Sequence, residues 1–79
     1  MNFYSLVEKE SGDLLADIVE FENKEIAIYW FCYDENIGSL FTYSSINIVK
    51  EYFVNSDRIL IKEGVEEDFN DVKDLLYSA

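Results

Sequence analysis

The chain contains no histidine, no proline and a single cysteine. The lack of histidine and the lack of a second cysteine each exclude or disfavour a class of chemistry. Histidine is the usual general base near neutral pH and the commonest side-chain metal ligand, so its absence disfavours acid–base catalysis and metal binding. One cysteine, Cys32, cannot form a disulfide within the chain, so nothing indicates a disulfide-stapled secreted domain. The sequence neighbours of Cys32 are aromatic and aliphatic rather than basic, which predicts a buried structural thiol and not a nucleophile.

Positive charge is also scarce. Six lysine and arginine residues face 17 aspartate and glutamate residues, for a formal net charge of −11. Such a charge repels nucleic acid and anionic lipid, so we expect no direct binding to nucleic acid or to a membrane. No apolar run approaches the roughly 20 residues that span a bilayer, and residues 1–4 lack the features of a signal peptide. We therefore expect a cytoplasmic protein, located in the host cytoplasm if a phage encodes it.

Glycine is rare as well, with three residues, whereas 49% of the chain is hydrophobic and 16% is aromatic. A disordered chain combines high charge with low hydrophobicity, and only the first condition holds here. The 79 residues therefore predict one small folded domain, 1–79, which buries about 60% of its unfolded surface.

Residues 25–33 are expected to form the central strand, because they are β-branched and aromatic and apolar on both alternating sets of positions. One set is Ile26, Ile28, Trp30 and Cys32, and the other is Ala27, Tyr29, Phe31 and Tyr33. A strand of this kind must be covered on both faces, or it exposes one of them as a binding surface.

The remaining pattern predicts strands at 2–8, 14–22, 39–43 and 58–62, with Gly12 and Asn23 in the left-handed conformation at tight turns. Ser44 or Ser45 is suited to cap a short helix that ends near residue 54. A second helix is expected from residue 65 or 66 to 77, with an apolar stripe at helical spacing. The predicted class is α+β: a mainly antiparallel sheet of about five strands, in the order β-β-β-β-α-β-α, with the C-terminal amphipathic helix packed on one face.

Carboxylate pairs are the remaining candidates for catalysis, and the two obvious pairs are Asp17 with Glu20 and Asp34 with Glu35. Acid–base catalysis requires that one carboxylate of the pair stays neutral in a dry pocket. In so small and acidic a domain we expect most carboxylates to be solvated. We therefore predict no enzymatic activity, no catalytic residue, no cofactor and no metal site.

Two acidic zones are visible in the sequence. The first covers the first hairpin, and its members are Glu8, Glu10, Asp13, Asp17, Glu20, Glu22 and Glu25. The second covers the expected C-terminal helix and its approach, and its members are Glu63, Glu66, Glu67, Asp68, Asp71 and Asp74. Rows of carboxylates on an ordered scaffold can imitate a phosphate backbone and occupy the basic groove of a nucleic-acid-binding enzyme. The plainer interpretation is a solvated surface that keeps the protein soluble.

The aromatic residues give a second indication of binding, because aromatic side chains are enriched at interface hot spots. If the helices leave part of the sheet uncovered, a hydrophobic patch is expected from Tyr29, Phe31, Tyr33, Phe41 and Tyr43. The alternative is ordinary core packing. The predicted partner-binding residues are therefore Glu66, Glu67, Asp68, Asp71, Asp74, Tyr29, Phe31 and Tyr33.

The segment Ser11-Gly12-Asp13-Leu14-Leu15-Ala16, the strand Ala27-Ile28-Tyr29-Trp30 and the capped helix from Ser44 together loosely resemble small bacterial and phage single-domain proteins. In size and acidity the chain is similar to phage-encoded inhibitors of host defence enzymes, including anti-restriction and anti-CRISPR proteins. The resemblance covers part of the chain and carries over no functional residue.

The leading hypothesis is a non-enzymatic protein that binds a basic surface of a larger partner, such as a nuclease or another nucleic-acid-binding enzyme. This hypothesis predicts binding that weakens steeply with salt. The alternatives are a homodimeric structural or accessory subunit that uses the aromatic sheet face, and an antitoxin or immunity protein.

Overall fold

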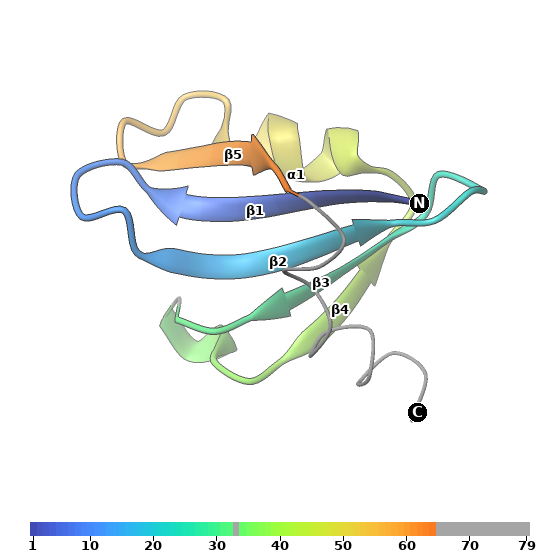
Figure 1. Cartoon of the computed structure of the whole chain (residues 1–79), viewed down its shortest axis with the longest axis horizontal. Helices are drawn as coiled ribbons and strands as arrows, with labels where there is room; N and C mark the ends of the chain where they lie inside the picture. Colours follow the sequence, from blue (N-terminus) through green and yellow to red (C-terminus); the bar gives the residue numbers. More distant parts are fainter. Residues whose placement is uncertain (33, 65–79) are drawn as a thin grey trace.

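Five strands form one antiparallel sheet, in the order β4-β3-β2-β1-β5 (Figure 1). The computed structural model describes residues 1–32 and 34–64. The elements, in chain order, are β1 (Asn2–Glu8), β2 (Leu14–Glu20), β3 (Ile26–Trp30), the 3-10 helix η1 (Asp34–Asn36), β4 (Leu40–Tyr43), α1 (Ile46–Phe53) and β5 (Ile59–Glu63). The expected α+β class and the antiparallel five-stranded sheet are confirmed. The helix expected from 65 or 66 to 77 lies outside the described residues.

The centre of the sheet is β2 rather than β3, which corrects the expectation for residues 25–33. β3 pairs with β2 on one side and with the edge strand β4 on the other. Within β2, Ile18 and its neighbour Val19 are both fully buried, and successive side chains of a strand point to opposite faces. β2 is therefore the strand whose two faces are both covered by other parts of the protein.

One face of the sheet is covered by α1, which lies nearer to β5 than to β4 (Figure 1). The helix is capped by Ser45, whose Oγ accepts a hydrogen bond of 3.1 Å from the Asn47 amide. Its apolar stripe joins the inner strands in the main hydrophobic core. The buried members of that core include Leu6, Ile18, Ile28, Trp30, Ile46, Val49 and Phe53. Within the described ranges, no helix has the length and apolarity needed to cross a membrane.

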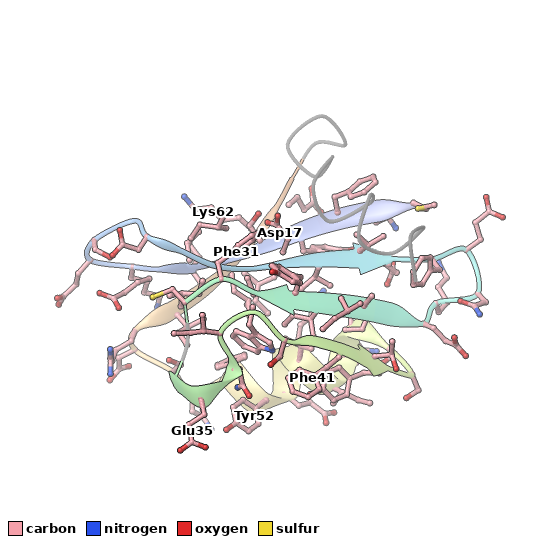
Figure 2. The ribbon with its side chains drawn as sticks, turned by 90° about the horizontal axis from the view of Figure 1, so that it is seen from below. Asp17, Phe31, Glu35, Phe41, Tyr52 and Lys62 are labelled. Carbon is pink, nitrogen blue, oxygen red and sulfur yellow. The ribbon has the colours of Figure 1, made fainter. Side chains whose placement is uncertain are left out.

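The opposite face carries a smaller apolar cluster. Phe3 and Val19 are buried there, and the partly buried rings of Phe21 and Tyr29 pack against them. The side chains labelled in Figure 2 separate the two faces: Glu35, Phe41 and Tyr52 lie on the α1 side, and Asp17, Phe31 and Lys62 lie on the other.

The two tight turns follow the expected chemistry, with one correction. Gly12 in the β1–β2 turn has a φ of 75°, as expected for a left-handed residue. In the β2–β3 turn the left-handed residue is Lys24, with a φ of 76°, and not Asn23. The Asn23 Oδ1 instead accepts a hydrogen bond of 3.1 Å from the Glu25 amide, which closes an Asx-type turn.

Candidate interaction surface

An apolar groove lies between α1 and the β4 side of the sheet. Its volume is about 240 Å³, and its lining side chains include Ile28, Trp30, Phe41, Tyr43, Ile48 and Tyr52. Clefts that hold cofactors or drug-sized ligands are larger, at about 300 to 1,000 Å³. The groove is therefore suited to one or two apolar side chains rather than to a cofactor.

The position of α1 explains why the groove exists. Ile48 and Tyr52 are separated by one helical turn and lie on the same side of α1, beside the buried stripe. The helix lies nearer to β5 (Figure 1), and these two residues line the groove together with Phe41 and Tyr43 of β4. Ile48 remains 43% exposed and Tyr52 remains 76% exposed, while Phe41 and Tyr43 on the facing strand are also exposed. Four large apolar side chains thus border one hollow.

The outer side of β4 has no partner strand within the described part of the chain. In the β3–β4 ladder the Trp30 amide donates a hydrogen bond of 3.0 Å to the Ser39 carbonyl, which sets the alternation of the ladder. By that alternation, Phe41 and Tyr43 direct their backbone groups to β3, whereas Leu40 and Thr42 direct theirs to the free edge. Within the described residues, the backbone donors and acceptors of Leu40 and Thr42 therefore have no partner strand along this edge.

Exposed carboxylates lie on two of the elements near this surface. Glu35 of η1 and Glu51 of α1 are both exposed, and Figure 2 shows Glu35 on the same side of the sheet as Tyr52. The basic residue of α1, Lys50, points to the other side of the helix, where its Nζ lies 5.7 Å from the ring centroid of Tyr4 in β1. The net charge of −11 and the exposed carboxylate of Glu35 on this side of the sheet therefore favour a cationic partner.

Two of the predicted partner-binding residues lie together, but away from the groove. Tyr29 packs in the cluster of Phe3 and Val19 on the face opposite α1, and its ring centroid lies 5.0 Å from that of Phe31 in an edge-to-face arrangement. Tyr29 pairs with Leu40, so Phe41 and Tyr43 fall on the α1 face, and the single aromatic patch expected from these residues is not formed. The other predicted residues, Tyr33, Glu66, Glu67, Asp68, Asp71 and Asp74, lie outside the described residues.

The first acidic zone is not a continuous row. Asp17 and Glu20 are buried, and because three positions separate them on β2 they point to opposite faces and do not form the carboxylate pair considered for catalysis. Glu8 is engaged by Arg58, with 3.6 Å between Oε2 and Nη2. The exposed members lie at opposite ends of the sheet, and they are Glu10 and Asp13 in the β1–β2 turn and Glu22 and Glu25 in the β2–β3 turn.

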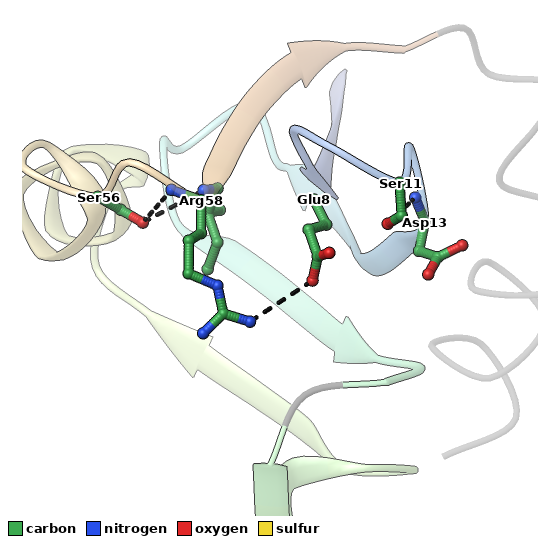
Figure 3. Close-up of polar contacts among 6 residues, drawn as sticks. Glu8, Ser11, Asp13, Ser56 and Arg58 are labelled. Carbon is green, nitrogen blue, oxygen red and sulfur yellow. Dashed lines mark hydrogen bonds and ion pairs between the residues drawn. The ribbon is translucent and has the colours of Figure 1, made fainter.

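Cys32 is exposed, which corrects the prediction of a buried thiol. The reason is that β3 ends at Trp30, so the apolar run leaves the sheet before it reaches the cysteine. Cys32 lines a hollow of about 510 Å³ that it shares with Arg58. Figure 3 shows the guanidinium of Arg58 directed at Glu8. Among the described residues, no three side chains of histidine, cysteine, aspartate or glutamate are grouped so as to hold a metal ion.

Tyr4 provides a test of the packing near β1. Burial raises the pKa of its phenol above the ordinary value near 10, and the negative charges of Glu20 and Glu63 raise it further. Folding therefore favours the neutral phenol. This stabilisation is complete below the pKa of the unfolded state and is lost as pH rises through the folded-state pKa. We expect Tyr4→Phe to remove the part of the tyrosinate absorbance that titrates above pH 10.

The control for this titration is the same pair of proteins in denaturant. There the difference in absorbance between the parent protein and Tyr4→Phe should be centred near the ordinary tyrosine pKa of about 10. A difference with the same midpoint in the folded and unfolded proteins would show that Glu20, Glu63 and burial leave this phenol unaffected.

No protein-family model matches the chain, and no curated protein or solved structure shows significant similarity to it. The groove, the free strand edge and the negative charge are therefore the observations from which a function follows.

Proposed function

We propose that this chain is a non-enzymatic interaction protein that binds a basic surface of a larger partner. The observation that supports the proposal most directly is the unbalanced charge of −11. Between the side chains of the described residues one ion pair forms, from Arg58 to Glu8, so the excess is not neutralised within this part of the fold. Charge of one sign steers a protein toward surfaces of the opposite sign and away from copies of itself.

In its most concrete form, the proposal is an inhibitor of a nucleic-acid-binding enzyme. Such enzymes hold the phosphate backbone in grooves rich in lysine and arginine, and a carboxylate-rich protein competes for the same charges. The setting that fits such an inhibitor is phage counter-defence, as an anti-restriction or anti-CRISPR protein. An antitoxin or immunity protein directed at a basic nuclease would use the same chemistry.

Salt dependence and competition test this function together. The full chain, immobilised through a terminal tag, would be used to capture host proteins at about 50 mM salt, with an unrelated neutral domain as control. We expect the retained proteins to bind nucleic acid, to elute as salt rises to about 500 mM, and to be displaced by duplex DNA. Capture that neither salt nor duplex DNA reverses would contradict the proposal.

Two neutralised variants locate the acidic zone that matters. One variant changes the carboxylates of the C-terminal segment to amides, at Glu66, Glu67, Asp68, Asp71 and Asp74, and the other changes the turn carboxylates Glu10, Asp13, Glu22 and Glu25. Because the second group is divided between the ends of the sheet, we expect the first variant to weaken partner binding by roughly tenfold or more and the second to weaken it less. Equal, small effects of both variants would indicate that the charge serves solubility alone.

A further inference from the structure

We propose that the free edge of β4 and the adjoining groove bind an extended, basic segment of the partner by strand addition. The incoming segment would become a sixth strand, with apolar side chains at alternate positions and lysine or arginine at its ends. This inference rests on the proposed function, because it names the place and the manner in which a cationic partner binds.

The backbone of β4 supplies the first part of the argument. Leu40 and Thr42 direct their N–H and C=O groups away from β3, so an added strand can form hydrogen bonds with both residues. Main-chain hydrogen bonds of this kind provide affinity that is independent of sequence when a peptide extends a sheet. The β5 edge is less suitable, since Arg58 precedes this strand, the strand itself contains Lys62 and Glu63, and α1 packs near it.

The groove supplies the second part of the argument. In a strand paired with β4, the residues opposite Phe41 and Tyr43 point to the α1 face, two positions apart. These residues would enter the hollow between β4 and the side chains of Ile48 and Tyr52. A volume of about 240 Å³ accommodates apolar side chains of moderate size, which gives the site a preference for alternating sequences.

Charge decides between the occupants of this site. The chain has a net charge of −11, Glu35 is exposed on the α1 side of the sheet, and Lys50 is directed toward Tyr4, so a segment with cationic ends is attracted electrostatically to this surface. A second copy of the chain would bring another net charge of −11 and a β4 strand, Leu40–Tyr43, that contains no basic residue. Self-pairing through this edge is therefore opposed by repulsion, and a basic partner strand is favoured.

A defined peptide and two variants at one position test the inference. The probe is the labelled peptide Lys-Lys-Ile-Thr-Ile-Thr-Ile-Lys-Lys, titrated with the full chain at low salt and followed by fluorescence anisotropy. Thr42→Pro removes an amide that faces the free edge, and proline is tolerated at such edge positions, so the variant should fold. Thr42→Val retains the amide and is the matched control. We expect Thr42→Pro to weaken peptide binding roughly tenfold or more and Thr42→Val to change it less than about twofold.

Hydrogen exchange provides a readout that requires no variant. Binding of the peptide should slow exchange of the Leu40 and Thr42 amides in the parent protein, since these are the groups that an added strand would engage. Unchanged exchange at both amides when the peptide is bound would overturn strand addition, and so would equal affinities of Thr42→Pro and Thr42→Val.

The outcomes separate this inference from the proposed function. If the two Thr42 variants bind equally and binding still weakens with salt, the chain binds cationic partners at another surface and only strand addition fails. If the peptide with glutamate in place of lysine binds as tightly as the lysine peptide, the inference and the electrostatic basis of the proposed function both fail. If sedimentation shows a dimer of the parent protein that Thr42→Pro dissociates, the occupant of the edge is a second copy, and a basic partner strand is excluded.

Discussion

Replacing Ile18 with alanine is expected to lower the free energy of unfolding by about 3 kcal/mol. Ile18 is fully buried at the centre of β2, where it pairs with Tyr4 of β1 and Ile28 of β3 under α1. Truncation removes three methyl or methylene groups and leaves a cavity that the surrounding strands fill only in part. A domain of this size has a total stability of roughly 5 kcal/mol, so the variant should retain only about 2 kcal/mol and unfold at a much lower urea concentration. Urea denaturation followed by circular dichroism measures the change.

The matched control is Ile48→Ala on α1. Ile48 is 43% exposed at the rim of the groove, so the same loss of atoms should cost about 1 kcal/mol or less. Equal losses of stability in the two variants would mean that the core is not centred on β2.

Val19→Asp is expected to have a larger effect and to prevent folding altogether. Val19 follows Ile18 in β2, is fully buried on the opposite face, and packs with Phe3. A carboxylate at this position would lose its hydration, or would have to bind a proton at neutral pH, and either requirement costs several kcal/mol. We expect a circular dichroism spectrum without sheet structure and poor dispersion of amide resonances.

Leu60→Asp on the same face provides the comparison. Leu60 lies in the edge strand β5 and is 40% exposed, so a charge there stays in contact with water. We expect this variant to fold, with a loss of roughly 1 kcal/mol. Val19→Asp folding as well as Leu60→Asp would show that the second face of β2 tolerates water.

The strands could be predicted from the sequence because alternation is a local property. β1 has the expected bounds, Asn2–Glu8, whereas β3 ends at Trp30, earlier than expected. The amides of Phe31 and Cys32 both donate to the carbonyl of Leu15, so the regular ladder ends there. The end of a strand is determined by its pairing partner, which lies elsewhere in the chain and is not visible in the local pattern. The expected strand therefore ran on to residue 33, and Cys32 was expected to be buried within it.

Turn conformations were predictable in kind but not in position. Gly12 takes the left-handed conformation because it has no Cβ, and no other residue in its turn is equally suited. In the second turn the sequence indicated Asn23, but its side chain accepts a hydrogen bond from Glu25, and the positive φ is found at Lys24. That choice depends on the register between β2 and β3.

The groove could not be predicted, because it depends on where α1 lies. The spacing of Ile48 and Tyr52 places them on one side of a helix, yet the same spacing is compatible with burial or with exposure. Only the crossover from β4 to β5 determines that α1 lies nearer to β5 and leaves the β4 side open. The aromatic patch was mispredicted for a related reason, since the pairing of Tyr29 with Leu40 decides which face receives Phe41.

The position of β1 inside the sheet has a consequence for synthesis on the ribosome. β1 emerges first, but one of its two neighbours, β5, is the last described strand to be made. Leu6 therefore cannot pair with Ile61 until β5 has been synthesised. The meander from β1 to β4 can assemble earlier through short-range contacts, whereas the pairing of β5 with β1 joins distant parts of the chain and is slow. A nascent chain that stalls before residue 59 would expose β1 as a sheet edge in place of the charged strand β5 and would be prone to aggregation.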